Sequence, residues 1–269
     1  MHTDSPRWIS DEFTVGLRSE ARVIRALMIR EAMTRYGHKD LGFFWLMGEQ
    51  LILTAGVIVM WGIAGLEHGR GGAGVVPMAL TGYGFIQLWR HIVGHSNQAI
   101  RHNSHLLYHQ QIKILDILVA NALLETIGTV SAFLIAYIPL SLYGVLYPIH
   151  DPLLLFGGFA FTGWLSFAVG LIIAGITELN EASSRIVAPI LYVTLPFTGL
   201  VFMVYWLPDQ YQDMIRWSPL VNCVEMIRAG IFPPYMKAYY SASYLLIWCV
   251  GLTAIGVPLV QYAQRHSHH

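Results

Sequence analysis

The sequence predicts an all-α membrane protein with six transmembrane helices, an amphipathic surface helix before the first of them, and a re-entrant helical hairpin between spans 5 and 6. The 269-residue chain is 55% hydrophobic and 12% charged, with a mean hydropathy of +0.52, as in polytopic membrane proteins. Its apolar residues form runs of about 20, the length that crosses a hydrocarbon core of roughly 30 Å. The segment between the last two runs is too polar to span and too apolar to leave the membrane.

The chain before the first span divides into a polar N-terminal segment, residues 1–16, and a surface helix, residues 17–42. In the second range apolar side chains recur at helical spacing, while arginines such as Arg22 and Arg25 lie one residue further round. This pattern predicts a cytoplasmic interfacial amphipathic helix, with an ordinary solvated basic face as the alternative.

The rest of the chain, residues 43–269, is expected to form one transmembrane domain. The six expected spans cover residues 43–66, 75–94, 117–146, 153–176, 186–206 and 243–262. Twelve of the 16 lysine and arginine residues, Arg90 among them, are assigned to one side of these spans. By the positive-inside rule, that side and both termini lie in the cytoplasm, and the hairpin lies on the outer side. Small residues at every fourth position of span 4, Ser166, Gly170 and Ala174, predict that another helix approaches closely.

The hairpin is predicted from helix start and stop signals. Pro208 begins a short helix that runs to Trp217, and a second begins after Ser218 and stops at Gly230. The second helix covers only about half of a membrane at 1.5 Å per residue. Two such half-helices between spans indicate a re-entrant pair buried in protein.

Two features of the hairpin indicate a gate. Glu225 and Arg228 are three residues apart and are expected to form a sheltered i,i+3 ion pair. Aromatic residues, including Trp217 and Tyr239, gather on the expected outer side. An interfacial belt explains most of them, and a platform for stacking sugar rings is the more specific alternative.

Only two ionisable residues lie clearly inside expected spans, Glu49 in the first and Glu125 in the third. Such residues are functional candidates because burying a charge in a membrane is costly. A clamp between helices is the other interpretation. Two carboxylates are too few for a proton relay.

The second cytoplasmic loop carries apolar residues among polar ones, which predicts a short helix that docks a cytoplasmic partner. The residues of this docking surface are His105, Leu106, Leu107, Tyr108 and His109.

Several chemistries are excluded by motif. The chain has no G-x-x-x-x-G-K-[ST] loop for ATP, no H-E-x-x-H and no G-x-S-x-G, and its zero net charge suggests no nucleic-acid partner. Histidines four residues apart, such as His91 and His95, raise the alternative of a membrane-embedded His-box metal oxidase or hydroxylase. The H-x-x-H-H boxes of such enzymes are missing, so no metal ligand is assigned.

Two sequence blocks carry a family resemblance. The first, residues 30–37, reads REAMTRYG and continues through LGFFW at 41–45 to Glu49; the second, residues 218–230, reads SPLVNCVEMIRAG. With the six-span layout, they make the chain, from about Leu17 onward, resemble ABC-2 type exporter permeases, and among them the permeases for capsular polysaccharide. Gln50 stands where the family often has proline, which puts only a local kink in doubt.

The resemblance implies a transporter permease of the bacterial inner membrane rather than an enzyme. It implies a homodimer that forms a continuous channel and binds a dimer of separate cytoplasmic ATPase subunits. ATP and magnesium then bind to the ATPase, and no cofactor binds to this chain. The expected substrate is a lipid-linked acidic glycan, which passes to periplasmic and outer-membrane polysaccharide export proteins.

Three sets of candidate site residues follow, and none is catalytic. The substrate entrance and channel set comprises Arg22, Arg25, Arg30, Arg35, Trp45, Glu49 and Glu125. The ATPase-docking set is the loop described above, and the re-entrant gate set comprises Trp217, Glu225, Arg228 and Tyr239. The arginines of the first set are expected to attract the acidic glycan, because each is worth roughly 1 kcal/mol against anionic head groups.

Overall fold

The computed structural model describes residues 7–36, 42–63, 74–103 and 113–266, and every regular element in these ranges is a helix. The elements are α1 (Arg7–Tyr36), α2 (Gly42–Ile63), α3 (Val75–Ser96), α4 (Ala99–His102), α6 (Ile114–Leu142), α7 (Pro152–Leu179), α8 (Glu181–Val193), η2 (Leu195–Phe197), η3 (Val204–Trp206), α9 (Asp209–Arg216), α10 (Pro219–Ala229) and α11 (Ala242–His266).

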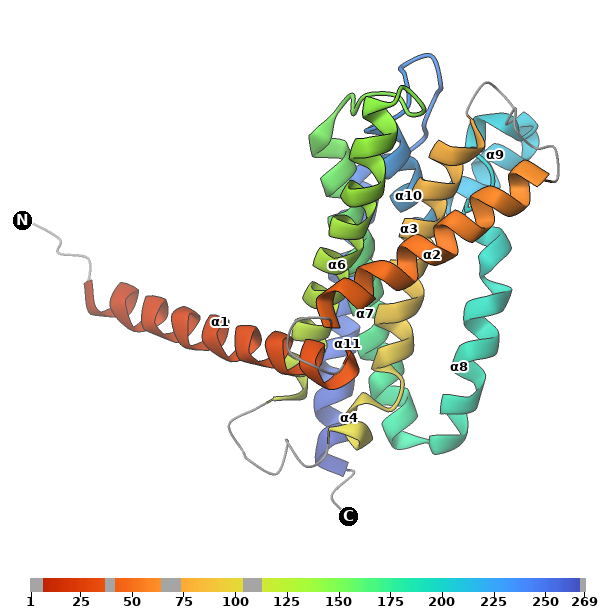
Figure 1. Cartoon of the computed structure of the whole chain (residues 1–269). Coiled ribbons are helices and arrows are strands. Elements are labelled where there is room, and N and C mark those ends of the chain that lie inside the picture. Colours follow the sequence, from red (N-terminus) through yellow and green to blue (C-terminus); the bar gives the residue numbers. More distant parts are fainter. Residues whose placement is uncertain (1–6, 37–41, 64–73, 104–112, 267–269) are drawn as a thin grey trace, which may run out of the picture.

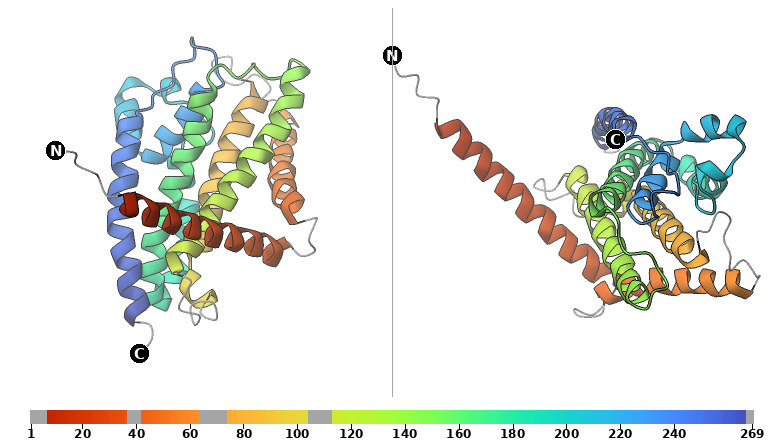
Figure 2. Two further views of the ribbon diagram at one scale, coloured as in Figure 1. Left: turned by 90° about the vertical axis from the view of Figure 1, so that its left-hand side faces the viewer. Right: turned by 90° about the horizontal axis from the view of Figure 1, so that it is seen from above.

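The long helices form an upright bundle around α7, which contacts α3, α6, α10 and α11 (Figure 1). One end of the bundle carries α4 and the C-terminal end of α11, and is called the α4 end; the other carries α9 and is called the α9 end. Helix α3 runs from the α9 end to the α4 end between α2 and α8, and α8 returns toward the α9 end. Helix α1 lies across the bundle and projects from it (Figure 2).

Small residues on α7 allow this central position. Ser166, Gly170 and Ala174 are buried, and a Cβ atom on Gly170 would overlap the Ser96 hydroxyl of α3. The close approach predicted from the small-residue pattern is therefore confirmed, and the approaching helix is α3.

Within the described ranges, three helices, α6, α7 and α11, are long and apolar enough to cross a membrane by length and composition. Helices α2 and α3 have 22 residues each, which corresponds to about 33 Å of helix, and they coincide with the first two expected spans. The third expected span ends four residues early, at Leu142.

The expectation of a continuous fifth span over residues 186–206 is wrong. Helix α8 ends at Val193 after 13 residues, about 20 Å, and the chain continues through two 3₁₀ turns. Proline at position 196 cannot donate a helical hydrogen bond, and Gly199 adopts a left-handed φ of +74°. We call residues 194–203 the break after α8.

The N-terminal helix also differs from its expected bounds. Helix α1 starts at Arg7, inside the segment expected to be only polar. Its buried side centres on Leu27, which packs with Ile114 and Leu118 of α6. Arg22 and Arg25 are exposed and Arg30 is partly exposed. The polar and apolar faces therefore separate as the amphipathic pattern predicted.

Candidate functional site

The break after α8 is bound by one buried arginine. Arg228 of α10 is fully buried, and its Nη1 donates hydrogen bonds to the carbonyl oxygens of Gly199 at 2.8 Å and Phe202 at 2.5 Å. Its Nη2 donates to the Leu200 carbonyl at 2.8 Å, and its Nε to Thr81 Oγ1 of α3 at 3.4 Å. These three carbonyl oxygens lie in the break, where no helical N–H group can pair with them. Buried carbonyl oxygens need hydrogen-bond donors, and the charged Arg228 side chain supplies them.

Glu225 is the counter-charge of this arginine. Its Oε1 lies 3.8 Å from Arg228 Nη1, and the two side chains are 1% and 0% exposed. Oε1 also accepts the Val204 N–H at 3.3 Å, and Oε2 accepts the Tyr239 N–H at 3.0 Å. The expected i,i+3 pair is therefore present and buried. Spacing alone did not indicate its backbone partners, through which the pair joins the break to the segment that precedes α11.

Short helix α10 is fixed at both ends. Asn222 donates to the Arg216 carbonyl at 2.8 Å and accepts the Ser241 N–H at 3.1 Å, which links α9 to the start of α11. At the other end the Gly230 carbonyl accepts the N–H groups of His150 and Asp151, each at 2.9 Å. Two short helices are thus present where the hairpin was expected.

The gate set divides into two layers. Glu225 and Arg228 are buried, whereas Trp217 and Tyr239 line a surface cavity of 560 Å³ at the α9 end. Arg216 lies over the Tyr239 ring, 5.0 Å from its centroid, and the Tyr244 hydroxyl donates to the Trp217 carbonyl at 2.6 Å. This cavity combines exposed aromatic rings with a guanidinium.

Glu125 occupies a polar contact between α3 and α6. Its buried carboxylate lies 3.3 Å from His91 Nδ1 and 3.7 Å from His95 Nε2, and His91 Nε2 lies 3.9 Å from Glu49 of α2. The two glutamates assigned to the channel are thus brought together through His91. The four-residue spacing of the histidines was visible in the sequence, but their carboxylate partners were not. Among the described residues, no group of three or more His, Cys, Asp or Glu could hold a metal ion.

This geometry supports the clamp interpretation for Glu125. We expect Glu125→Gln to lower the free energy of unfolding by about 1–3 kcal/mol, because a buried hydrogen-bonded charge is lost. The side chain of Glu49 is 43% exposed, so Glu49→Gln is the matched control and should change stability by less than about 1 kcal/mol. Thermal unfolding of the detergent-purified chain measures both. Equal shifts in the two variants would contradict the clamp.

A further ion pair joins α4 to the turn between α7 and α8. Arg101 Nη1 lies 2.8 Å from Glu181, and Arg101 Nε lies 3.6 Å from Glu178. The hydrogen bond from Arg101, followed by its charge, lowers the pKa of Glu181. The four-residue spacing of Glu181 and Arg185 would allow an ion pair within α8. The principal partner is instead Arg101, about 80 residues earlier in the chain.

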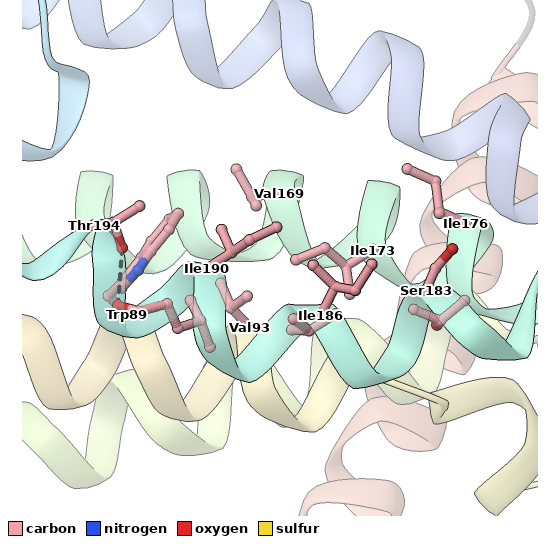
Figure 3. A pocket seen from close by; sticks show the side chains of 12 residues that line it. Trp89, Val93, Val169, Ile173, Ile176, Ser183, Ile186, Ile190 and Thr194 are labelled. Carbon is pink, nitrogen blue, oxygen red and sulfur yellow. Dashed lines mark hydrogen bonds between the residues drawn. The ribbon is translucent and has the colours of Figure 1, made fainter.

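An apolar crevice of 290 Å³ separates α8 from α3 and α7 (Figure 3). Its walls include Trp89 and Val93 of α3, Ile173 of α7, and Ile186 and Ile190 of α8. No charged side chain lines it, so it suits hydrocarbon rather than a sugar. Helix α8 is therefore packed loosely along this side.

The remaining predicted residues have no described side-chain environment. Arg35 lies in α1 and Trp45 in α2, but their side chains are outside the described part of the structure. The docking set, His105, Leu106, Leu107, Tyr108 and His109, lies outside the described residues altogether.

The described part of the chain defines an all-helical protein with three helices long and apolar enough to cross a membrane, and with an unwound, charge-stabilised segment beside a short-helix pair. The chain is 31% identical over 92% of its length to the capsule polysaccharide export inner-membrane protein CtrC of Neisseria meningitidis serogroup A, covering 93% of that protein. It is 30% identical over 93% of its length to the protein of the same description, BexB, from Haemophilus influenzae, covering 94% of it. The polysialic acid transport protein KpsM of Escherichia coli is 28% identical over 91% of this chain and 94% of its own length.

The chain belongs to the family of capsule polysaccharide export inner-membrane proteins. The predicted resemblance to capsule export permeases is thereby confirmed. No protein-family model matches the chain. The relatives are transport proteins, so the metal oxidase or hydroxylase alternative gains no support.

Proposed function

We propose that this chain is the transmembrane subunit of an ATP-driven exporter that moves a lipid-linked acidic capsular polysaccharide across the bacterial inner membrane. The observation that carries the proposal is its similarity to capsule export proteins over more than nine-tenths of both chains. One relative is named for polysialic acid, a polymer of an acidic sugar, which supports an anionic substrate.

In this proposal the α4 end and both termini lie in the cytoplasm, and the α9 end with the short helices faces outward. The distribution of lysine and arginine supports this orientation. Helices α2, α3, α6, α7 and α11 cross the membrane, α8 crosses it only in part, and α9 with α10 forms the re-entrant hairpin. The buried Glu225–Arg228 pair then lies behind the outer gate and holds the unwound segment together.

Two copies of the chain would line the path for the glycan, with exposed apolar residues of α2 and α8 available to a second copy. These residues are Ile52, Val59, Met60, Ile186, Ile190 and Val193. The exposed arginines of α1, Arg22 and Arg25, would attract the acidic substrate to the cytoplasmic entrance. Periplasmic and outer-membrane export proteins would receive it.

Energy would come from a separate cytoplasmic ATPase dimer that binds ATP and magnesium, because the chain has no P-loop. We assign its docking to the loop that contains Leu107. The test is co-purification of an ATPase with the full-length chain from its native membrane, together with ATP hydrolysis stimulated by added glycan. Absence of a stoichiometric ATPase in the native complex would overturn the proposed function.

The docking site gives a specific prediction. Leu107→Asp should reduce the co-purified ATPase at least about tenfold, because a charge in an apolar contact leaves an unpaired, desolvated group. The control for an added acidic residue is Lys237→Asp, because Lys237 is exposed and lies outside the proposed docking loop. This variant should co-purify the ATPase as the unmodified chain does. Normal ATPase recovery and export with Leu107→Asp would place the docking surface elsewhere.

A further inference from the structure

Arg90 lies on helix α3 rather than in a flanking loop, and its side chain is partly exposed. It is six residues before the end of α3 at Ser96, which corresponds to about 9 Å along the helix axis. Its guanidinium carbon is 4.8 Å from the centroid of the Tyr192 ring, and its Nη2 donates to the Tyr192 hydroxyl at 3.1 Å. Tyr192 is the last residue but one of α8, the helix that begins at the α4 end.

The direction of this contact fixes where the charge lies. Asn97 and Gln98, which follow α3, hydrogen-bond to Ser184 of α8, so these residues lie at one level. Measured from that level, Arg90 is seven residues and Tyr192 eight residues further into the bundle, about 10 Å and 12 Å. The guanidinium that binds Tyr192 therefore stays at this depth in the bundle and does not extend to the α4 end. An arginine that extended toward lipid head groups would point toward that end.

Arg90 also lacks the acidic partner that the other described interior and hairpin arginines have. Arg228 pairs with Glu225, Arg216 with Asp213 and Arg101 with Glu181. Within the described ranges, no carboxylate lies within 4.0 Å of Arg90, and its contacts are those with Tyr192. A guanidinium has five N–H donors, so most of its hydrogen-bonding capacity remains available.

The same face of α3 carries two more polar side chains. Tyr83 and Gln87 precede Arg90 by seven and three residues, a spacing that places all three along one side of the helix. The Gln87 amide nitrogen is buried and has no hydrogen-bond partner among the described residues. An arginine and an unpaired amide are costly against lipid, and in membrane helices such groups face the protein interior or a water-filled path.

We propose that Arg90, held in place by Tyr192, binds an oxyanion of the exported glycan at membrane depth. The ligand is a carboxylate or phosphate group on the sugar chain, which a guanidinium can bind through two parallel hydrogen bonds. The inference rests on the proposed function and adds to it a residue on the translocation path, outside the apolar crevice, which neither Arg90 nor Tyr192 lines. Partial exposure of Arg90 and 57% exposure of Tyr192 leave this site accessible.

The test measures oligosaccharide binding to the full-length chain in phosphatidylcholine nanodiscs, with and without its co-purified ATPase. An oligomer of sialic acid and a maltooligosaccharide of equal length are the anionic and neutral probes. Arg90→Gln should weaken binding of the sialic acid oligomer about tenfold while leaving the neutral probe unchanged, because a charge-assisted pair is lost. The affinity of Arg90→Lys for the sialic acid oligomer should lie between those of the unmodified chain and Arg90→Gln, because lysine keeps the charge but not the planar pair of donors.

Arg185→Gln is the matched control, because Arg185 is an exposed arginine at the other end of α8. It should bind the sialic acid oligomer as the unmodified chain does. Unchanged affinity of Arg90→Gln for the anionic probe would overturn the site, as would equal loss of both probes, which indicates damage to the fold. A further measurement uses nanodiscs that contain both phosphatidylcholine and phosphatidylglycerol. If Arg90→Gln reduces the enrichment of phosphatidylglycerol around the chain but leaves binding of the sialic acid oligomer unchanged, Arg90 binds a lipid head group instead. If the unmodified chain binds neither probe, the proposed function itself fails.

Discussion

Arg228→Ala is expected to lower the free energy of unfolding by about 3–5 kcal/mol, the cost of leaving a buried charge without its partner. Glu225 would remain buried, and the carbonyls of Gly199, Leu200 and Phe202 would lose their charged donors. The break after α8 then has no fixed conformation, so export of capsule should be lost even where the chain still inserts.

Thermal unfolding of the purified chain and capsule export in cells measure this effect. Arg216→Ala is the matched control, because Arg216 lies in the same hairpin but is 48% exposed and pairs with Asp213 at 3.3 Å. An exposed pair of this kind is worth at most about 1 kcal/mol. Similar shifts for the two variants would contradict a structural role for the buried arginine.

The double variant Glu225→Ala/Arg228→Ala separates the ion pair from the backbone contacts. The double variant leaves no uncompensated buried charge, so its free energy of unfolding should be higher than that of Arg228→Ala alone. Recovery should remain incomplete because the three carbonyls are still unsatisfied. Strictly additive losses would show that the two side chains are not coupled.

The Glu225–Arg228 pair and its backbone contacts show which part of the site could be predicted from the sequence. The three-residue spacing of Glu225 and Arg228 was enough to predict the ion pair, because helix geometry places such residues on one face. The backbone partners of Arg228 lie 26–29 residues earlier, in a segment whose apolar composition resembles a continuous span. Hydropathy records only transfer into lipid, so it could not indicate that Arg228 supplies donors to an unwound stretch.

The helices of the bundle were predictable for a related reason. Helices α3, α7 and α11 are long apolar runs bounded by turn residues, and α10 has proline at its first position and glycine at its end. The proline and glycine at positions 196 and 199 were also visible inside the fifth run. Membrane helices tolerate such residues when neighbours satisfy the backbone, and the neighbours are known only from the tertiary structure.

The same limit applies to the intramembrane charges. Glu49 and Glu125 were recognisable because a carboxylate inside an apolar run is rare. The proximity of both to His91 depends on how α2, α3 and α6 pack. Arg90 was assigned to the flanking charges because it is close to the end of its run, and only its contact with Tyr192 shows that its side chain does not extend to the α4 end.

Gly82→Ala is expected to disturb the same break from the side of α3. A Cβ atom on Gly82 would overlap the carbonyl oxygen of Leu200, which already accepts a hydrogen bond from Arg228. The obstacle is backbone and cannot rotate away, so either α3 or the break must shift. Overpacking of this kind costs about 1–3 kcal/mol, which exceeds the roughly 1 kcal/mol that alanine gains over glycine in a helix.

Gly84→Ala on the same helix is the matched control, because its added Cβ would meet only the Phe133 and Phe159 rings at 3.7–3.8 Å, an ordinary contact distance. We expect this variant to unfold at an unchanged or higher temperature and to export normally. Gly82→Ala should unfold at a lower temperature and export less. If both variants behave alike, close contact between α3 and the break is not required, and the carbonyl of Leu200 is held by Arg228 without support from α3.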